Sequence, residues 1–334
     1  MSRPRVGFLG TGWIGRHRMQ AMLDTGRIEP VAIVDPSPEC AEAALAVAPD
    51  AVILPSLEAM LEHGVDGVAI ATPSALHAEQ AITALEHGAA VFCQKPLGRS
   101  EAEARRAVDA ARQADRLLSV DLSYRRTQAA EAVVERIRSG ALGQIFAADL
   151  VFHNAYGPDK AWFYDRELSG GGCLMDLGVH LVDLALWALD WPAVENVSGN
   201  LFAKGKPLSQ APSSVEDYAV AQLELAGGAV VRIACSWHLN AGCEAMIGAS
   251  FHGTQGGAAL RNVDGSFYDL AADAFAGTTS QLLCTPPDEW GGRQAADWAT
   301  RLAAGEGFDP AAEQILVSAR VLDQIYRLAQ PAQY

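Results

Sequence analysis

The sequence predicts an α/β protein of two domains: a doubly wound parallel sheet over residues 1–122, then an α+β domain with an open, mostly antiparallel sheet over 123–334. Two observations lead to this prediction. Short apolar strands alternate with helical patterns as far as residue 121, and longer strand-like segments then follow one another with few helices between them. The chain has 334 residues, half of them hydrophobic, which is enough material for two cores.

The first strand, Arg5–Leu9, runs into a glycine-rich turn, GTGWIG, and then into a helical pattern over residues 13–23. In this context the turn is typical of a dinucleotide-binding (Rossmann) fingerprint. Gly10 allows the tight turn, Gly12 a close approach to a pyrophosphate, and Gly15 the packing of helix on strand. The free amides at the helix start would face the phosphates.

The second strand, Val31–Val34, ends at Asp35, twenty residues after Gly15. A carboxylate there would accept hydrogen bonds from the adenosine ribose hydroxyls and would repel a 2′-phosphate. Pro36 and Ser37 follow, without an arginine that could bind such a phosphate. We therefore expect NAD rather than NADP.

The rest of the first domain repeats the same alternation. We expect helices at 38–48, 75–87 and 100–114 and strands at 67–71, 89–93 and 117–121. Two sequences follow strand ends, where α/β sheets bind ligands: Ala71-Thr-Pro-Ser-Ala-Leu-His77 and Cys93-Gln-Lys-Pro96. Lys95 is well placed to bond a substrate oxygen and favour its alkoxide form, the alternative being a solvated surface lysine. His77 is expected near the cofactor and not as a catalyst.

In the second domain we expect strands at 144–152, 194–202, 218–226, 229–237 and 244–251, with helices at 127–139, 293–304 and 310–328. A triple glycine, Gly170–Gly172, precedes a further predicted helix and would let it approach a ligand closely. Asp176, His180 and Asp183 share one face of that helix. An apolar face lies beside it, formed by Leu174, Leu177, Leu181, Leu184 and Ala188.

His180 is the side chain best suited to take a proton near neutral pH, and Asp176 could orient its ring. The alternative is a helix whose polar face simply meets water. Candidate substrate contacts come from the start of this domain, although packing or loop solvation is at least as probable for any one of them. They are Tyr124, Arg126, His153, Asn154, Tyr156, Lys160 and Trp162.

Composition excludes several classes of function. The net charge of −15 and a pI near 4.9 argue against nucleic acid and anionic membranes as partners. We expect no transmembrane helix or secretory segment, and hence a cytoplasmic protein. The six cysteines show no zinc-type spacing, so we expect no metal, and the chain has no GxSxG motif of a serine hydrolase.

Together GTGWIG, ATPSALH, QKP and GGGCLMDLGVHLVD resemble the glucose-fructose oxidoreductase and inositol dehydrogenase (Gfo/Idh/MocA) family over nearly the whole chain. The resemblance implies that Lys95 positions the reacting hydroxyl, His180 is the general acid or base, and Asp176 supports it. Gln94 stands where this family usually has glutamate. The candidate cofactor contacts are Gly10, Gly12, Trp13, Ile14, Gly15, Asp35, Ala71, Thr72, Pro73, His77, Gln94 and Lys95.

The expected reaction is oxidation of a secondary alcohol, on a sugar or polyol, by NAD. Two alternatives stay open: an NAD-dependent glycosidase that uses transient redox chemistry, and a noncatalytic NAD-binding regulator. A sheet with one face uncovered by helices commonly associates, so we expect a homodimer or homotetramer through the C-terminal sheet.

Overall fold

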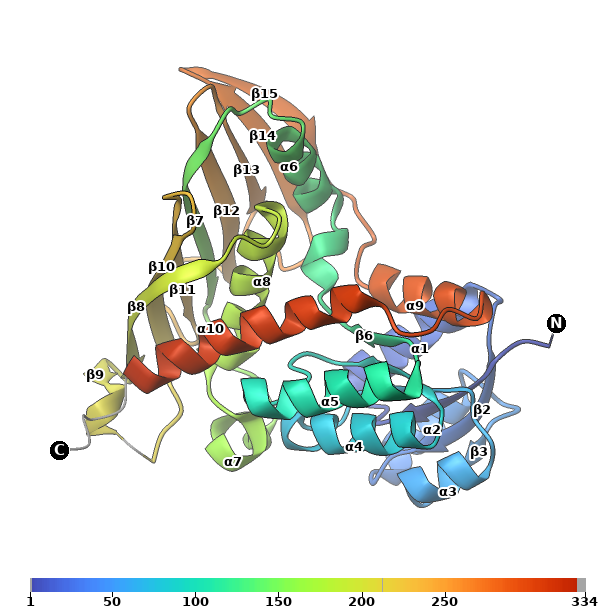
Figure 1. Cartoon of the computed structure of the whole chain (residues 1–334). Coiled ribbons are helices and arrows are strands. Elements are labelled where there is room, and N and C mark those ends of the chain that lie inside the picture. The colour runs from blue at the N-terminus through green and yellow to red at the C-terminus, as the bar shows by residue number, and fades with distance from the viewer. Residues whose placement is uncertain (1, 212, 329–334) are drawn as a thin grey trace. The chain divides into compact units, whose positions relative to one another are not determined.

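The computed structural model describes residues 2–211 and 213–328 (Figure 1), and these residues form two compact units. The first unit contains the chain as far as Ser123 and also Gly291–Leu316. The second unit contains the described residues of Tyr124–Trp290 and of the chain from Val317 to Leu328. The division thus differs from the single boundary expected after residue 122, because a late segment returns to the first unit.

The first unit is built on six parallel strands in the order β3-β2-β1-β4-β5-β6. The order reverses between β1 and β4, so the carboxyl ends of these two strands flank the place where such sheets bind ligands. The expected doubly wound sheet is confirmed. Its strands are β1 (Arg5–Leu9), β2 (Glu29–Val34), β3 (Val52–Ile53), β4 (Gly67–Ile70), β5 (Ala90–Cys93) and β6 (Leu118–Val120).

Late helix α9 belongs to this unit because its tryptophan lies in the unit's core. Trp298 is fully buried, and its ring lies 6.0 Å from that of Phe92 on β5. Its ring also lies so close to Gly67 on β4 that a Cβ there would be 2.8 Å from it. The helices of the unit are α1 (Trp13–Asp24), α2 (Pro38–Leu45), α3 (Leu57–Glu62), α4 (Ser74–Glu86), α5 (Glu101–Ala114) and α9 (Arg293–Ala303), with a 3-10 turn, η5, at Pro310–Glu313.

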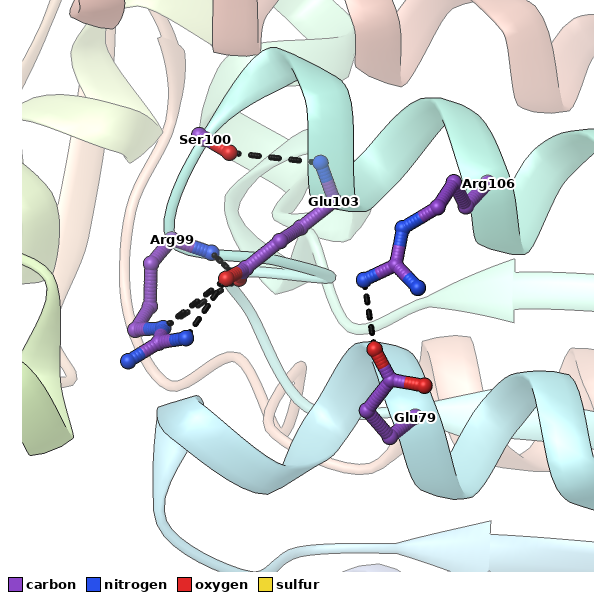
Figure 2. A network of polar contacts seen from close by, with 5 residues as sticks. All are labelled: Glu79, Arg99, Ser100, Glu103 and Arg106. Atoms are coloured by element: carbon purple, nitrogen blue, oxygen red, sulfur yellow. Dashed lines mark hydrogen bonds and ion pairs between the residues drawn. The ribbon is translucent and has the colours of Figure 1, made fainter.

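Figure 2 shows how α5 is fixed directly after the loop that follows β5. Ser100 caps the helix by accepting a hydrogen bond from the Glu103 amide at 3.2 Å. The Glu103 carboxylate turns back to accept from the Arg99 amide at 2.8 Å and from the Arg99 guanidinium at 2.6 Å. Arg106 pairs with Glu79 on α4, at the exposed surface. These contacts tie the loop that carries Lys95 to two helices.

The second unit contains a nine-stranded sheet in the order β15-β14-β13-β12-β7-β11-β10-β8-β9. Among the described strands of this sheet β7 and β11 alone pair in parallel, which confirms the open, mostly antiparallel sheet. The strands β9 and β13 to β15 were not predicted. The strands are β7 (Ile145–Asn154), β8 (Val194–Ala203), β9 (Lys206–Pro207), β10 (Tyr218–Leu225), β11 (Val230–Ser236), β12 (Ala245–Gly253), β13 (Gly257–Asn262), β14 (Leu270–Ala276) and β15 (Thr279–Cys284).

Helices α6 (Gln128–Arg138) and α8 (Val179–Ala188) lie on one face of this sheet (Figure 1). The strand side chains that point to them, such as Leu150, are buried. Alternate side chains point to the opposite face, where Val220 and Met246 are more than a third exposed. The remaining helical elements are η1 (Ser123–Arg126), η2 (Ala161–Tyr164), α7 (Arg166–Ser169), η3 (Leu174–Gly178), η4 (Leu208–Gln210) and α10 (Gln314–Leu328), which begins in the first unit.

One stretch of the second unit has the length and apolar composition of a membrane span. The stretch Arg166–Ala188 contains α7, η3 and α8, and its length and mean hydropathy of 1.3 would suffice to cross a membrane. In the structure 83% of its most apolar window is buried within the protein. This is how a core helix behaves, because its apolar surface packs against the sheet of its own unit.

Candidate active site

The glycine-rich turn of the first unit contains two glycines that the fold requires and one that it does not. Gly10 has a φ of +82°, and a Cβ on it would lie 2.7 Å from the Ala71 carbonyl carbon and oxygen. A Cβ on Gly15 would lie 2.2 Å from the Gly10 oxygen. Around Gly12, by contrast, the described residues leave open space within 4 Å. Gly12 thus leaves its backbone accessible to a ligand.

The same turn leaves the start of α1 available to an anion. Within residues 2–211 and 213–328 no side chain caps the helix at Gly12, and the first turn of α1 contains no acidic residue. The amides at a helix start carry a partial positive charge and need acceptors. Trp13, at the first helical position, is 63% exposed and could cover a bound ligand. Ile14 follows it and is half-buried.

Asp35 lies at the end of β2 and faces the glycine-rich turn. Its carboxylate accepts hydrogen bonds from the Thr11 amide at 2.6 Å and from the Ser37 amide at 2.8 Å. Oδ2 also accepts from the Thr11 hydroxyl at 3.2 Å, whereas Oδ1, which accepts from Ser37, has room for a second hydrogen bond. Asp35 therefore orders the turn and can still bind the hydroxyls of a ribose.

The ends of β4 and β5 are joined through His77, which is 1% exposed. Its two ring nitrogens lie 2.7 Å from the carbonyl oxygens of Thr72 and Pro96. Burial lowers the pKa of His77, and the charge of Lys95 lowers it further. His77 thus supports the loops from behind and has almost no surface for the cofactor contact expected of it. Gln94 is likewise buried, whereas Lys95 is half-buried.

In the second unit, other parts of the protein occupy the space beside the triple glycine. A Cβ on Gly171 would lie 1.9 Å from the Tyr326 hydroxyl, and a Cβ on Gly172 would lie 1.9 Å from the Glu216 carbonyl oxygen. The expectation that these glycines allow a ligand to approach is corrected. They are small because a tyrosine from α10 and the chain before β10 pack against them.

The Glu216 side chain binds the backbone amides at the start of the helix that carries the candidate catalytic residues. Its Oε1 accepts from the Gly172 amide at 2.8 Å, the Leu174 amide at 3.0 Å and the Tyr326 hydroxyl at 2.7 Å. Burial raises the pKa of this carboxyl, while the three hydrogen bonds act in the opposite direction. The position of this helix thus depends on a contact between residues far apart in sequence.

The candidate catalytic residues Asp176 and His180 lie on a π-helical turn, η3, and on the first turn of α8. Asp176 is half-buried and accepts a hydrogen bond from the Trp237 indole at 3.2 Å. His180 is 9% exposed, and its ring packs edge-on against Tyr124 with 4.9 Å between centroids. Burial raises the pKa of Tyr124, and the charge of Asp176 raises it further. Tyr124 is therefore a neutral hydrogen-bond donor.

Asp183 is not part of a free polar face, contrary to expectation. It is 2% exposed and accepts a hydrogen bond from Arg125 Nε at 2.7 Å. The Arg125 guanidinium also stacks on Trp191 at 5.1 Å. The helix is buried nearly all round, and Asp183 anchors η1 to α8.

The candidates His153 and Asn154 point to opposite faces of the sheet. His153 pairs in register with Met246 and Ser236, bonds the Ser236 hydroxyl at 2.8 Å, and lies on the face away from α8. We therefore exclude His153 from the site. Asn154 lies on the same face as Phe152, which contacts Tyr124. Its Oδ1 is buried and has no hydrogen-bond partner among the described residues.

The remaining substrate candidates are spread over η1 and the loop after β7. Tyr156 is 49% exposed and packs on Phe267, and Lys160 is exposed beside Asp159. Trp162 stacks on its neighbour Phe163, and Arg126 is half-buried on η1.

Sequence reasoning missed Trp237 and Tyr164, whose rings lie 5.5 Å apart. The signal for Trp237 was its place at the end of a predicted strand. What the sequence does not reveal is that this strand, β11, runs parallel to β7, so that both strands end at the same edge.

Comparison with known proteins agrees with this architecture. Residues 4–122 match the model described as "Oxidoreductase family, NAD-binding Rossmann fold", and residues 130–259 match the "GFO/IDH/MocA C-terminal domain". The D-glucoside 3-dehydrogenase of Escherichia coli (strain K12) is 32% identical over 205 residues, which are 58% of this chain and 58% of that protein. The levoglucosan dehydrogenase of Pseudarthrobacter phenanthrenivorans (strain DSM 18606 / JCM 16027 / LMG 23796 / Sphe3) is 28% identical over 58% of this chain and 54% of its own length. These matches thus span little more than half of each relative.

Among solved structures, levoglucosan dehydrogenase in complex with NADH and levoglucosan superposes with a TM-score of 0.82 at 23% identity. The match covers 98% of this chain and 97% of that chain. At this identity the likeness concerns the fold. With both domain models matched in order over most of the sequence, the chain belongs to the Gfo/Idh/MocA family of NAD-binding oxidoreductases.

Proposed function

We propose that this protein is an NAD-dependent dehydrogenase that oxidises a secondary alcohol of a sugar, a polyol or a related small molecule. The observation that carries the proposal is the placement of Asp176 and His180 four residues apart on one buried helical stretch, in a chain whose other unit has an accessible dinucleotide cradle. A purely regulatory protein needs the cradle but not an acid/base pair.

The cradle fits NAD on three counts. The α1 amides have no side-chain cap, Gly12 leaves open space, and Asp35 can accept from ribose hydroxyls. Because the Asp35 carboxylate would repel a 2′-phosphate, we propose NAD over NADP. Related folds have been solved with NAD, with NADH and with NADP, so the preference rests on Asp35 and its surroundings.

The bound nicotinamide supplies the acceptor for the hydride that leaves the alcohol carbon. His180 takes the hydroxyl proton, so that the O–H and C–H bonds break and a carbonyl forms. Lys95 stabilises negative charge on the oxygen, and each of these two effects is worth roughly 10²-fold. Asp176, held by a hydrogen bond from Trp237, would orient the His180 ring.

The substrate side is suited to a molecule with several hydroxyl groups. The buried Asn154 Oδ1 finds no hydrogen-bond partner in the described part of the chain, and a buried polar atom without a partner is costly. A second hydroxyl of the substrate would satisfy it. Tyr124 offers a neutral donor beside His180, and Arg126, Tyr156, Lys160 and Trp162 stay candidates for outer contacts.

We further propose a cytoplasmic homodimer or homotetramer that associates through the exposed face of the nine-stranded sheet, the face of Val220 and Met246. The first unit would bind the cofactor, and the second would bind the substrate and the neighbouring subunit. Light scattering at micromolar concentration checks the assembly, and a monomer would contradict it.

The decisive screen offers polyols, aldoses and sugar acids with NAD and NADP and follows the absorbance of reduced nicotinamide. We expect net NADH with at least one polyhydroxy substrate. Release of an aglycone without net NADH would instead indicate a redox-assisted glycosidase. Tight NAD binding without turnover of any substrate class would indicate a regulator.

A further inference from the structure

Polar side chains from three separate elements meet in the interior of the first unit. Arg18 on α1 donates from Nε to Asp121 Oδ2 at 2.6 Å, and the Gln94 amide donates to the same oxygen at 2.6 Å. The Ser123 hydroxyl donates to Asp121 Oδ1 at 2.7 Å and accepts from Arg18 at 3.1 Å. Each of these side chains is at most 8% exposed. We call Arg18, Gln94 and Asp121 the buried triad.

The charges of the buried triad balance: one guanidinium, one carboxylate and one neutral amide. Two titratable groups face it from outside. The His17 ring accepts from Arg18 at 2.9 Å, and burial and the Arg18 charge lower its pKa. Burial and the Asp121 charge raise the pKa of the Cys93 thiol. Both groups are therefore uncharged near neutral pH and leave the balance unchanged.

The triad connects two parts of the proposed catalytic machinery. Arg18 belongs to the helix whose start carries the glycine-rich turn, and Gln94 directly precedes Lys95 at the end of β5. Asp121 follows β6 and bonds both of them. A shift of any one of these side chains would change the spacing between the glycine-rich turn and Lys95.

We propose that Gln94 is a positioning residue for Lys95, and that it must be neutral because Asp121 already supplies the one negative charge that Arg18 balances. This deepens the proposed function and rests on it for the role of Lys95. A glutamate in this chain would place a second carboxylate within hydrogen-bond distance of Asp121, in a nearly dry site with a single guanidinium.

A double-mutant cycle tests the charge balance without cofactor or substrate. We expect Gln94→Glu to lower the melting temperature by roughly 5 °C or more. Asp121→Asn should also destabilise, because it leaves the Arg18 guanidinium buried without a carboxylate. The combined variant restores one carboxylate and one amide in exchanged positions. Its loss in melting temperature should therefore be much smaller than the sum of the losses in the two single variants.

The chain offers a matched control on the same helix as Arg18. Gln20 donates to Asp24 at 2.7 Å, which is the same pairing of an amide with a carboxylate, but at an exposed site. Gln20→Glu therefore creates the same carboxylate pair in water. We expect almost no change in melting temperature, since exposed charges are screened.

The pH dependence separates charge from shape. A carboxyl whose pKa is raised in the folded state loses stability as the pH rises from the ordinary glutamate value of about 4.3 to the folded value. The deficit of Gln94→Glu should therefore be larger at pH 8 than at pH 5. Once a substrate is identified, the kcat of Gln94→Glu, taken relative to that of the unmodified enzyme, should also fall from pH 5 to pH 8.

Two results would overturn the proposed charge balance of the triad. One is a cycle in which the two losses simply add, and the other is a Gln94→Glu protein that melts like the unmodified one at both pH values. If Gln94→Glu does not fold, a soluble combined variant supports the proposal, and an equally insoluble one refutes it. An unchanged kcat in Gln94→Glu at both pH values would overturn the positioning role. A coupled cycle in a protein that oxidises no alcohol would refute the proposed function alone.

Discussion

Two glycine-rich turns lead into helices in this protein, and they serve opposite purposes. In the first unit, the described residues leave open space around Gly12, and no side chain caps the helix that follows. In the second unit, Tyr326 and Glu216 occupy the space beside Gly171 and Gly172. The amides of the first turn are therefore available to a ligand, whereas amides of the second turn donate to the Glu216 carboxylate.

The difference teaches that a glycine cluster before a helix indicates close approach, but not what approaches. The partner is decided by side chains distant in sequence. Glu216 lies 44 residues after Gly172, and Tyr326 lies 110 residues after Glu216. The cofactor turn needs pre-organised, open amides. The helix of the proposed catalytic residues instead needs a fixed position, which its buried start provides because Glu216 accepts hydrogen bonds from its first amides.

The largest expected effect is on turnover, and it distinguishes the proposed catalytic role of α8 from the cofactor-binding role of α1. His180→Ala should lower kcat by roughly 10²- to 10⁴-fold, because the proposed base is lost. The affinity for NAD should hardly change, since the cradle belongs to the other unit. Steady-state kinetics with calorimetry of NAD binding checks this. Near-normal turnover would place the base elsewhere and reduce the Asp/His pair to a polar part of a core helix.

The second prediction concerns the sealed turn. Gly172→Ala should destabilise the second unit by about 3 kcal/mol or more, because the new Cβ would lie 1.9 Å from the Glu216 carbonyl oxygen and backbone must move. Denaturant unfolding measures the loss. A variant as stable as the unmodified protein would show that the packing around this turn is looser than described.

The third prediction tests the cofactor choice at the open turn. Asp35→Ser combined with Pro36→Arg should narrow or reverse the preference for NAD, by roughly tenfold or more, since arginine attracts a 2′-phosphate. Asp35→Ser alone should weaken both cofactors, because the Thr11 amide loses its acceptor. Equal affinity of the unmodified protein for NAD and NADP would contradict the assignment.

The smallest expected effect comes from the hydrogen bonds of Glu216 at the second turn. Because burial raises the pKa of Glu216, stability falls as the pH rises through that pKa, and Glu216→Gln should remove this fall while keeping the Oε1 acceptor. Tyr326→Phe should cost about 1–2 kcal/mol through the lost hydrogen bond. Unfolding at pH 5 and pH 8 checks both, and a parallel pH dependence in Glu216→Gln would rule out the carboxyl as its source.

Sequence patterns predicted the local features and missed the long-range ones. The first parallel sheet followed from apolar strands that alternate with helices, and the cofactor turn followed from its place between β1 and α1. Strand parity around buried Phe152 could have separated His153 from Asn154, because adjacent residues point to opposite faces. The role of Glu216 could not be predicted, because it depends on a tertiary contact that no local pattern encodes.

The central claim is that the first turn is kept open for a dinucleotide, and calorimetric titration of Gly12→Ala with NAD tests it most directly. A Cβ at Gly12 meets nothing within 4 Å in the described protein, so the melting temperature without ligand should stay unchanged. The affinity for NAD should fall by roughly tenfold or more, because the methyl group occupies space that the pyrophosphate needs. Unchanged NAD affinity in a folded Gly12→Ala protein would contradict the account.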